Sequence, residues 1–259
     1  MTMYVIVQRS ERASFRPPVP DRKEDNFMES QSPLQIQAYD YLKEMILSGK
    51  LEPDVLYSET RLSAQIGISR TPMREALRCL SQDGYITVVP SKGFMLRSLT
   101  GQDMEESIQI RCAIEGFCVQ VIAAEAGTKK GRKLLGELER LLEKQEKVLK
   151  LKQGPSAENI RSGSWNREAL EQFMEYDHQF HWALINYIGN REFQQTFQRL
   201  MYLIHLTTAK ALSVPGRTED TLKEHRLFYS YLQDGDGDGA YKLMMVHLMM
   251  PLAMHLTGD

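Results

Sequence analysis

Cysteine is scarce in this chain of 259 residues, which contains only three. Cys79, Cys112 and Cys118 are odd in number and match no metal-ligand spacing. Each falls within an apolar pattern of helical period, so small buried thiols in a reducing compartment are the simplest interpretation. The sequence therefore argues against both a disulfide-stapled scaffold and a cysteine-based zinc site.

Long apolar runs are also missing from the sequence. We find no stretch that approaches the roughly 20 apolar residues of a membrane-spanning helix. The first residues, MTMYVIVQRSER, contain a short apolar run followed by Arg9 and Arg12, without the organisation of an export signal. We therefore expect a soluble cytoplasmic protein with no membrane partner.

An excess of charge of one sign is missing overall, because the net charge is only −2 at pH 7. The distribution is more informative than the sum. Residues 61–97 contain six Lys and Arg against two Asp and Glu, whereas residues 98–259 contain 19 against 22. One segment therefore has a local charge of +4 in an otherwise acidic chain, which is typical of a domain that binds a polyanion.

The N-terminal third of the chain has a recognisable order of elements. Residues 1–30 mix charge with three prolines and predict a poorly ordered arm. Helices are expected near 33–47, near 59–66 and from about residue 70, and the strands YITVV and FMLRS then flank a PSKG turn. Three helices followed by a hairpin predict a winged helix-turn-helix over residues 31–98.

The remaining residues, 99–259, are helical apart from short breakers, and the chain length suits two domains. Helices are expected near 102–126, 129–152, 165–188, 190–213, 217–234 and 239–257. Short connections between such helices predict an antiparallel bundle of six or seven helices, which makes the chain mainly α. The DGDGDG stretch resembles the start of a calcium loop, but Met245 stands where the twelfth-position glutamate is required, so a polar turn is the better interpretation.

The segment SRTPMREALRCL places Arg70, Arg74 and Arg78 at intervals of four residues, opposite an apolar face. As the second helix of a helix-turn-helix, it would enter the major groove, where arginine is the commonest reader of guanine. We expect Arg70 and Arg74 to read bases and Thr71 to contact phosphate or a thymine methyl group. The alternative is an ordinary amphipathic helix with an arginine-rich outer face.

Lys92 and Gly93, at the tip of the predicted hairpin, could approach the DNA backbone or the minor groove.

The whole stretch SETRLSAQIGISRTPMREALRCLSQDGYITVVPSKGFML resembles the DNA-binding domain of GntR-family bacterial transcription regulators. This resemblance implies that operator DNA is bound through the arginine helix and the wing. The family often has an arginine directly after the Ser-Glu pair, but this chain has Thr60 there. Arg61 is therefore expected to reach DNA by a shifted geometry, unless that contact is lost.

A second group of chemically notable residues lies in the helical half. In EYDHQFHWALI, Asp177 and His181 are four residues apart and share one helix face. His225 and His247 lie on either side of a turn midway between them, so antiparallel packing would bring them to a similar height. One carboxylate and three imidazoles suit Zn²⁺, Ni²⁺ or a similar divalent metal. A local Asp–His hydrogen bond and a core histidine are the alternatives.

The layout of residues 102–257 resembles the FCD ligand-binding domain, the FadR-type C-terminal half of many GntR regulators. The resemblance rests on Arg111 and Glu115 in IRCAIEGFCVQVIA, on D-x3-H followed by IGN, and on the two later histidines. It implies that the Asp and the three His hold a divalent metal, and that a small organic acid completes the coordination while pairing with Arg111. A salt bridge from Arg111 to Glu115 is the alternative role for that arginine.

These patterns predict a ligand-responsive, homodimeric DNA-binding transcription regulator and not an enzyme. Two other functions stay open: a metal-dependent enzyme that uses the same Asp/His site, and a regulator whose metal is only structural. No general acid–base pair is visible beside the ligand set, which disfavours the enzyme. The sequence leaves open the effector, the operator, and whether the protein is a repressor or an activator.

Overall fold

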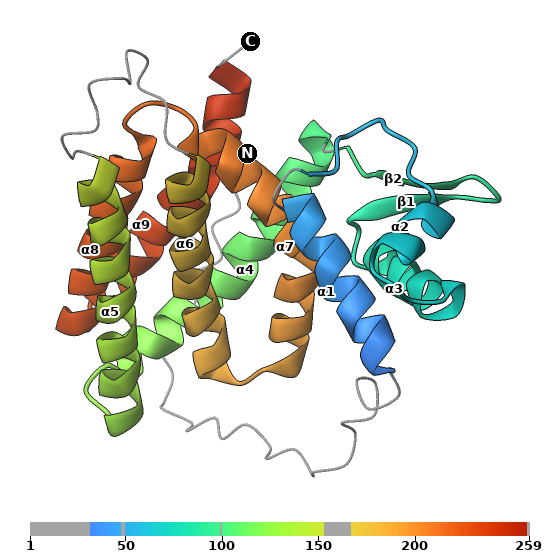
Figure 1. Ribbon diagram of the computed structural model, residues 1–259. Helices are drawn as coiled ribbons and strands as arrows, with labels where there is room; N and C mark the ends of the chain where they lie inside the picture. The colour runs from blue at the N-terminus through green and yellow to red at the C-terminus, as the bar shows by residue number, and fades with distance from the viewer. Residues whose placement is uncertain (1–31, 48–49, 99, 153–166, 258–259) are drawn as a thin grey trace, which may run out of the picture.

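The computed structural model describes residues 32–47, 50–98, 100–152 and 167–257, so the predicted arm over residues 1–30 lies outside the described residues. Within these ranges the chain forms nine helices and one two-stranded sheet (Figure 1). In chain order the elements are α1 (Pro33–Leu47), α2 (Glu59–Gln65), α3 (Arg70–Gln82), β1 (Ile86–Val89), β2 (Gly93–Leu96), α4 (Gly101–Glu125), α5 (Lys129–Lys152), α6 (Arg167–Ile188), α7 (Arg191–Leu212), α8 (Arg217–Asp234) and α9 (Gly237–Thr257).

The first three helices and the hairpin form the predicted winged helix-turn-helix, which is confirmed. The side chain of Ser58 caps α2 by accepting a hydrogen bond from the backbone N–H of Arg61 at 3.4 Å. Helix α3 turns Met73 and Leu77 into the N-terminal core and leaves its polar face outside. Strands β1 and β2 pair antiparallel and form the wing.

The six remaining helices form the predicted helical bundle (Figure 1). Helix α4 runs obliquely across the helical domain (Figure 1). Large apolar side chains from several helices fill the centre of this domain. Fully buried examples are Ile122, Leu138, Phe180, Leu184 and Leu232. The YIGN break is a local turn, in which Gly189 has a φ of +70° after α6 and Asn190 caps α7 by accepting hydrogen bonds from two backbone N–H groups.

Helix α4 corrects one expectation from the sequence. By length and composition it contains a stretch apolar enough to cross a membrane, with a mean hydropathy of 1.3. More than half of that stretch is buried inside the helical domain. The apolar character of this buried part therefore follows from its place in the core of the bundle.

The winged helix-turn-helix region and the helical domain share part of their apolar packing. Tyr202 of α7 is buried in the N-terminal core, where its ring centroid lies 4.9 Å from that of Tyr85. Its hydroxyl donates a hydrogen bond to the backbone oxygen of Arg97 at 3.0 Å. Arg97 also forms an ion pair with Asp103 in the first turn of α4. The junction is therefore held by specific contacts, while the exact domain boundary at residues 98 and 99 stays a prediction.

Candidate metal centre and nucleic-acid interface

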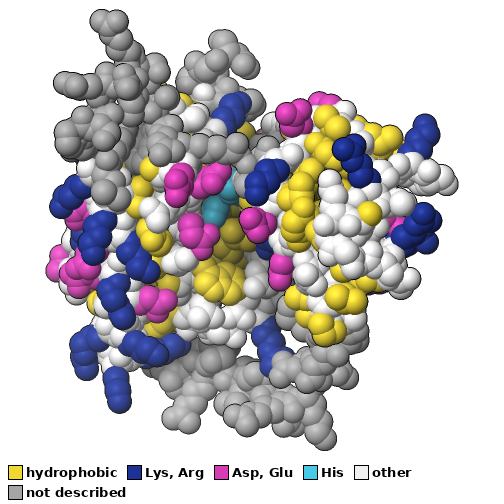
Figure 2. Space-filling view, in the orientation of Figure 1, with side chains coloured by type: hydrophobic (Ala, Val, Ile, Leu, Met, Phe, Trp, Pro, Cys, Tyr) yellow, Lys and Arg dark blue, Asp and Glu magenta, His cyan; other side chains and the backbone are white. Residues whose placement is uncertain are grey.

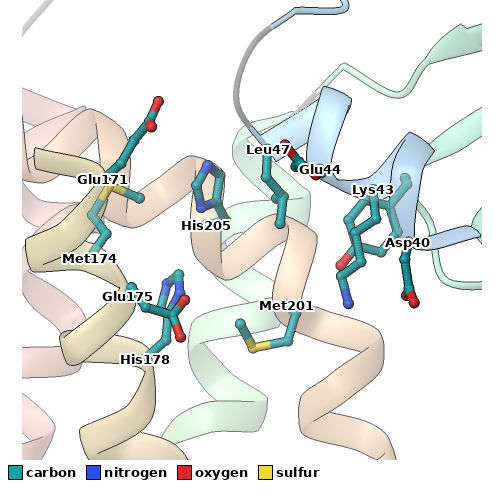
Figure 3. Close-up of a pocket in the computed structure, with 11 residues that line it drawn as sticks. Asp40, Lys43, Glu44, Leu47, Glu171, Met174, Glu175, His178, Met201 and His205 are labelled. Carbon is teal, nitrogen blue, oxygen red and sulfur yellow. The ribbon is translucent and has the colours of Figure 1, made fainter. Parts of the chain in front are cut away.

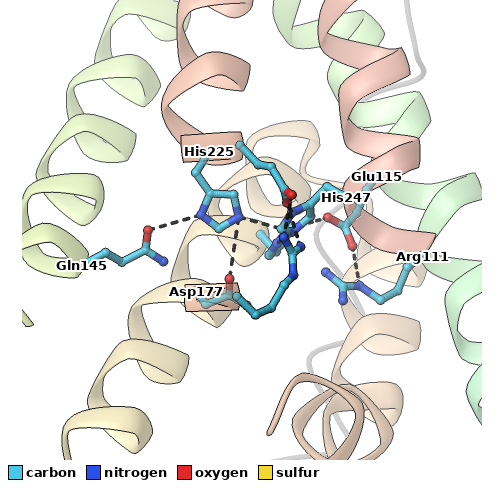
Figure 4. Close-up of polar contacts among 9 residues, drawn as sticks. Arg111, Glu115, Gln145, Asp177, His225 and His247 are labelled. Carbon is cyan, nitrogen blue, oxygen red and sulfur yellow. Dashed lines mark hydrogen bonds and ion pairs between the residues drawn. The ribbon is translucent and has the colours of Figure 1, made fainter. Parts of the chain in front are cut away.

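The structure brings together the four side chains that the sequence singled out in the helical half (Figure 4). Asp177 and His181 come from α6, His225 from α8 and His247 from α9, and their potential ligand atoms all lie within 4.8 Å of one another. The Nε2 atom of His247 lies 3.2 Å from that of His181 and 3.3 Å from that of His225. His225 Nε2 lies 3.6 Å from Asp177 Oδ1.

The outward-facing nitrogen of each histidine has its own partner. Each Nδ1 atom contacts a side-chain oxygen of another residue, and the acceptors come from α4, α5 and α8. The pairs are His181 with Glu115, His225 with Gln145 and His247 with Glu224, with N···O distances of 2.5, 3.2 and 2.6 Å. Since these oxygens accept, each Nδ1 carries the hydrogen, and each Nε2 presents a lone pair to the centre of the cluster.

Both carboxylates in this outer layer are paired with arginines. Arg111 Nε donates to Glu115 at 2.7 Å, and Arg217 forms a two-pronged ion pair with Glu224 at 2.5 and 2.8 Å. Burial alone would raise the pKa of Glu115, but the charge of Arg111 and the hydrogen bonds from His181 and Arg111 lower it to about 2. Burial would likewise raise the pKa of Glu224, but the hydrogen bonds from His247 and Arg217 lower it to about 2. Both groups therefore stay ionised at neutral pH.

Burial acts in the opposite direction on the histidines. It lowers the pKa of His225 well below its ordinary value, and the neighbouring His247 and His181 lower it further. Burial also lowers the pKa of His247, although the hydrogen bond to Glu224 opposes this. These imidazoles are therefore neutral near pH 7, which is the protonation state that coordinates a metal.

A narrow cavity of about 30 Å³ adjoins the cluster and is lined by Arg111, Asp177, Arg217 and His247, among others. The salt bridge from Arg111 to Glu115, considered above as an alternative, is present. It uses only part of the guanidinium, because Arg111 Nη2 is buried without a hydrogen-bond partner among the described residues. Arg111 can therefore hold Glu115 and still present a donor to another group.

Sequence reasoning missed Gln145, Arg217 and Glu224. Gln145 lies 80 residues from its partner His225, and no local spacing announces that contact. Arg217 and Glu224 are seven residues apart on α8, or about two turns, so they share a helix face. That spacing was a usable signal for an ion pair at the beginning of α8.

The predicted DNA-reading residues lie on the outer surface of the winged helix-turn-helix. Arg61, Arg70, Thr71, Arg74 and Lys92 are all exposed. Arg74 Nε donates to Glu59 at the start of α2, but the Arg74 side chain is still 67% exposed. Arg78 is tied to its own helix through Glu75 and Gln82. Their roles in DNA binding stay predictions.

Gly93 has a structural reason to be glycine. Its φ is +142°, and a Cβ atom there would lie 2.0 Å from the backbone oxygen of Tyr57. Tyr57 and Phe94 exchange backbone hydrogen bonds of 2.8 and 3.0 Å, which attach the segment before α2 to the wing. Any contact of Gly93 with DNA would come in addition to this role.

A winged helix-turn-helix followed by a C-terminal helical domain is the architecture of a class of DNA-binding transcription regulators, and two family models match this chain. The model described as "Bacterial regulatory proteins, gntR family" matches residues 34–96, and the FCD domain model matches residues 106–249, more than half of the chain. The protein belongs to the GntR family of bacterial transcription regulators, in the group with an FCD domain, and it is not an enzyme.

Relatives of this chain support the same assignment. The uncharacterized HTH-type transcriptional regulator YdhC of Bacillus subtilis (strain 168) is 29% identical over 224 residues, which cover 86% of this chain and 92% of the relative. The HTH-type transcriptional repressor RspR of Escherichia coli (strain K12) is 26% identical over 216 residues, which cover 83% and 86%.

Solved structures agree with the observed fold. A putative GntR transcriptional regulator from Rhodococcus sp. RHA1 is similar with a TM-score of 0.70 at 18% identity, covering 88% of this chain and all of that one. McbR/YncC of E. coli gives a TM-score of 0.67 at 21% identity with the same coverage. At these identities the likeness concerns the fold alone.

Proposed function

We propose that this protein is a cytoplasmic, homodimeric repressor whose binding to operator DNA responds to a small carboxylate at a divalent metal ion, zinc or nickel. Asp177, His181, His225 and His247 would hold the metal. One observation carries this proposal: three Nε2 lone pairs face one point, while each ring's N–H group is committed to an outer acceptor.

The distances between these nitrogens fit a metal ion. Zinc–nitrogen bonds of roughly 2.0–2.1 Å in a tetrahedral site place neighbouring nitrogens roughly 3.3 Å apart. The Nε2 atoms lie 3.2 and 3.3 Å apart along the two contacts of His247. Three lone pairs at such distances repel one another unless a positive charge lies between them. The paired outer oxygens would fix the ring orientations and raise the basicity of the ligands.

The adjoining cavity supports the choice of a carboxylate as effector. Arg111, which has an unpaired buried donor, and Arg217 both line this cavity. Its volume of about 30 Å³ is far too small for an organic acid, so the acid could enter only if the cavity opens. A larger surface cavity of about 430 Å³ also contacts Arg217 and Glu224, and this ion pair is the element that would have to move.

DNA binding would use the exposed face of α3 and the wing. Arg70 and Arg74 would read bases, Arg61 and Thr71 would contact the adjacent bases or phosphates, and the loop at Lys92 would follow the backbone. A homodimer would place two such surfaces on the half-sites of a palindromic operator. The effector would regulate by binding more tightly to one arrangement of the two surfaces than to the other.

The test starts from an operator selected from random duplexes by the purified protein. Operator affinity is then measured for zinc-loaded, nickel-loaded and chelator-treated protein, with and without a panel of lactate, malate and citrate. The proposal predicts that the metal-free protein stays folded and binds the operator, but no longer responds to any acid that acts on the loaded protein. Unfolding upon chelation would favour the purely structural metal. Absence of any bound zinc or nickel after loading would overturn the metal site.

A further inference from the structure

A second cavity lies between the winged helix-turn-helix region and the helical domain, away from the histidine cluster. Its volume is about 470 Å³, and α1, α6, α7 and Tyr85 line it. The space-filling view shows acidic side chains gathered near a histidine on this face of the molecule (Figure 2). Sites for small molecules range over roughly 300–1,000 Å³, so this interdomain cleft has the size of a ligand site.

The walls of the interdomain cleft are acidic on both sides. Asp40 and Glu44 extend from α1, and Glu171 and Glu175 from α6, across from them (Figure 3). Within the described part of the chain, Lys43 is the one Lys or Arg that lines the cleft, so four carboxylates against one ammonium leave three net negative charges. A cleft lined by one sign of charge concentrates ions of the opposite sign, which indicates a cationic occupant.

Two buried polar atoms in the cleft lack partners, and this observation is independent of the charge. Tyr85 is completely buried and His178 is 9% exposed, and both residues line the cleft. The Tyr85 hydroxyl and His178 Nε2 have no hydrogen-bond partner among the described residues. Buried polar groups are nearly always hydrogen-bonded in native proteins. Two exceptions in one cavity therefore point to a ligand that would supply the missing partners.

The arrangement of these groups favours an organic cation over a metal ion. Among the described residues, the Asp177 cluster is the group whose ligand atoms converge closely enough for a metal. The carboxylates of the interdomain cleft are instead spread along facing walls, with Leu47, Met174 and Met201 between them. A short aliphatic chain would fit the apolar part, and an ammonium group at each end would meet the carboxylates.

We propose that the interdomain cleft is a second ligand site, distinct from the metal centre, that binds a small aliphatic diamine. One ammonium group would lie against Glu171 and Glu175 and donate to His178 Nε2. The other would lie near Asp40 and Glu44 and donate to the Tyr85 hydroxyl oxygen. An ammonium has three donors and no acceptor, which suits this set of acceptors.

Such a ligand would join the two parts of the protein. Helix α1 belongs to the winged helix-turn-helix region, whereas α6 also carries the metal-cluster residue Asp177 beside His178. The two parts already meet at this place, because Leu47, the last residue of α1, and His205 of α7 both line the cleft. A bound diamine would strengthen this connection and reduce the freedom of the DNA-binding region to reorient.

The test measures binding of 1,4-diaminobutane to the full chain by isothermal titration calorimetry. 1,4-Butanediol, which has the same length without charge, and succinate, which has the opposite charge, serve as comparison ligands. We expect saturable binding of the diamine at one site per chain and no detectable binding of the diol. Succinate belongs to the class of acids proposed for the metal centre, and it should not compete with the diamine. Equal binding of the diol would overturn the proposal, because it would show that charge does not select the ligand.

Glu175→Gln has a matched control elsewhere in the chain. Glu175 accepts a hydrogen bond from Gln179 four residues later, and Glu105 accepts one from Gln109 in the same way on α4, outside the cleft. Glu175 is exposed in the free protein, so Glu175→Gln should weaken diamine binding about two- to five-fold, the range expected for an exposed ion pair, while Glu105→Gln should not change it. The same affinity in both variants would contradict the proposed site.

Tyr85→Phe separates a binding role from a structural one. The hydroxyl has no hydrogen-bond partner among the described residues, so its removal should leave the unfolding midpoint unchanged or raise it. Diamine affinity should nevertheless fall several-fold. His181→Ala tests the separation of the two sites and should leave diamine affinity unchanged. Diamine binding that is lost in His181→Ala but kept in Tyr85→Phe and Glu175→Gln would place the ligand at the metal cluster and overturn the inference.

Discussion

The histidine cluster and the arginine row of α3 are both sets of three nitrogen-bearing side chains, but they are built in opposite ways. His181 and His225 are almost completely buried, and each uses one ring nitrogen for an outer acceptor and turns the other toward the centre. The arginines lie on one helix, and Arg74 and Arg78 remain 67% and 52% exposed. The buried set is complete only after α6, α8 and α9 have packed together, whereas the exposed set is complete once one helix has formed.

This difference teaches where each site obtains its specificity. Buried groups need partners in the protein, so the cluster is defined by hydrogen bonds that hold each ring in one orientation. Exposed guanidinium groups are solvated in the free protein, and their specific partner would be the DNA. Substitutions should therefore act strongly and jointly in the cluster, but individually in the arginine row.

The largest effect is expected from His181→Ala. The variant removes one inward lone pair and also leaves a buried oxygen of Glu115 without its partner. Zinc affinity should fall by more than the roughly 10–100-fold that outer partners contribute in metal sites. Competition with a fluorescent zinc chelator measures this change. His205→Asn, a histidine outside the cluster, should keep the affinity of the original protein. Equal zinc binding by both variants would contradict the cluster.

Two variants distinguish the arginine of the row that we expect to read a base from the one that we expect to contribute little to DNA binding. Arg74→Ala should weaken binding to the selected operator by about 1–3 kcal/mol and relax the preference for one base pair. Arg78→Ala should have a much smaller effect, because Arg78 is already held by Glu75 and Gln82 on its own helix. Fluorescence anisotropy at two salt concentrations measures both. An operator affinity unchanged in Arg74→Ala would remove α3 from the DNA interface.

Gln145→Met tests the outer layer of the cluster alone. The replacement keeps the length of the side chain and removes the acceptor of His225 Nδ1, without changing any charge. We expect zinc affinity to fall about tenfold, because the ring of His225 would lose the contact that fixes its orientation. Unchanged affinity in a variant that folds like the original would show that this hydrogen bond does not support the metal site.

The smallest effect is expected at the contact between the two regions. Tyr202→Phe keeps the ring against Tyr85 and removes the hydrogen bond to the backbone of Arg97. The free energy of unfolding should fall by about 1 kcal/mol, which urea denaturation can measure. Zinc affinity should not change. A loss of zinc binding in this variant would show that the two regions are more tightly coupled than their separate contacts indicate.

Local patterns in the sequence predict most of the fold. The glycine, proline and serine breakers place the helices correctly because they act within a few residues of themselves, as Gly189 and Asn190 do between α6 and α7. The arginine spacing on α3 and the Asp177–His181 pair are equally local. His225 and His247 join that pair because helices linked by a short turn pack antiparallel.

The outer partners could not be predicted in the same way. Glu115 lies 66 residues from His181, and Gln145 lies 80 residues from His225. Which residues meet over such distances depends on how each helix is rotated in the bundle, and periodicity alone does not fix that rotation. The interdomain cleft was even less predictable from the sequence. Its walls come from two regions of the chain, and no local pattern encodes how these regions are placed relative to each other.

The position of Tyr202 has a consequence for exchanging modules between related regulators. A recombinant protein joined at residues 98 and 99 would receive every element of a winged helix-turn-helix region, but α7 supplies one aromatic ring, that of Tyr202, to the core of this region. If the transferred winged helix-turn-helix region had no aromatic residue at position 85, the ring of Tyr202 would lose its packing partner. Successful chimaeras should therefore transfer residue 202 together with the N-terminal segment, although more than 100 residues separate them in the gene.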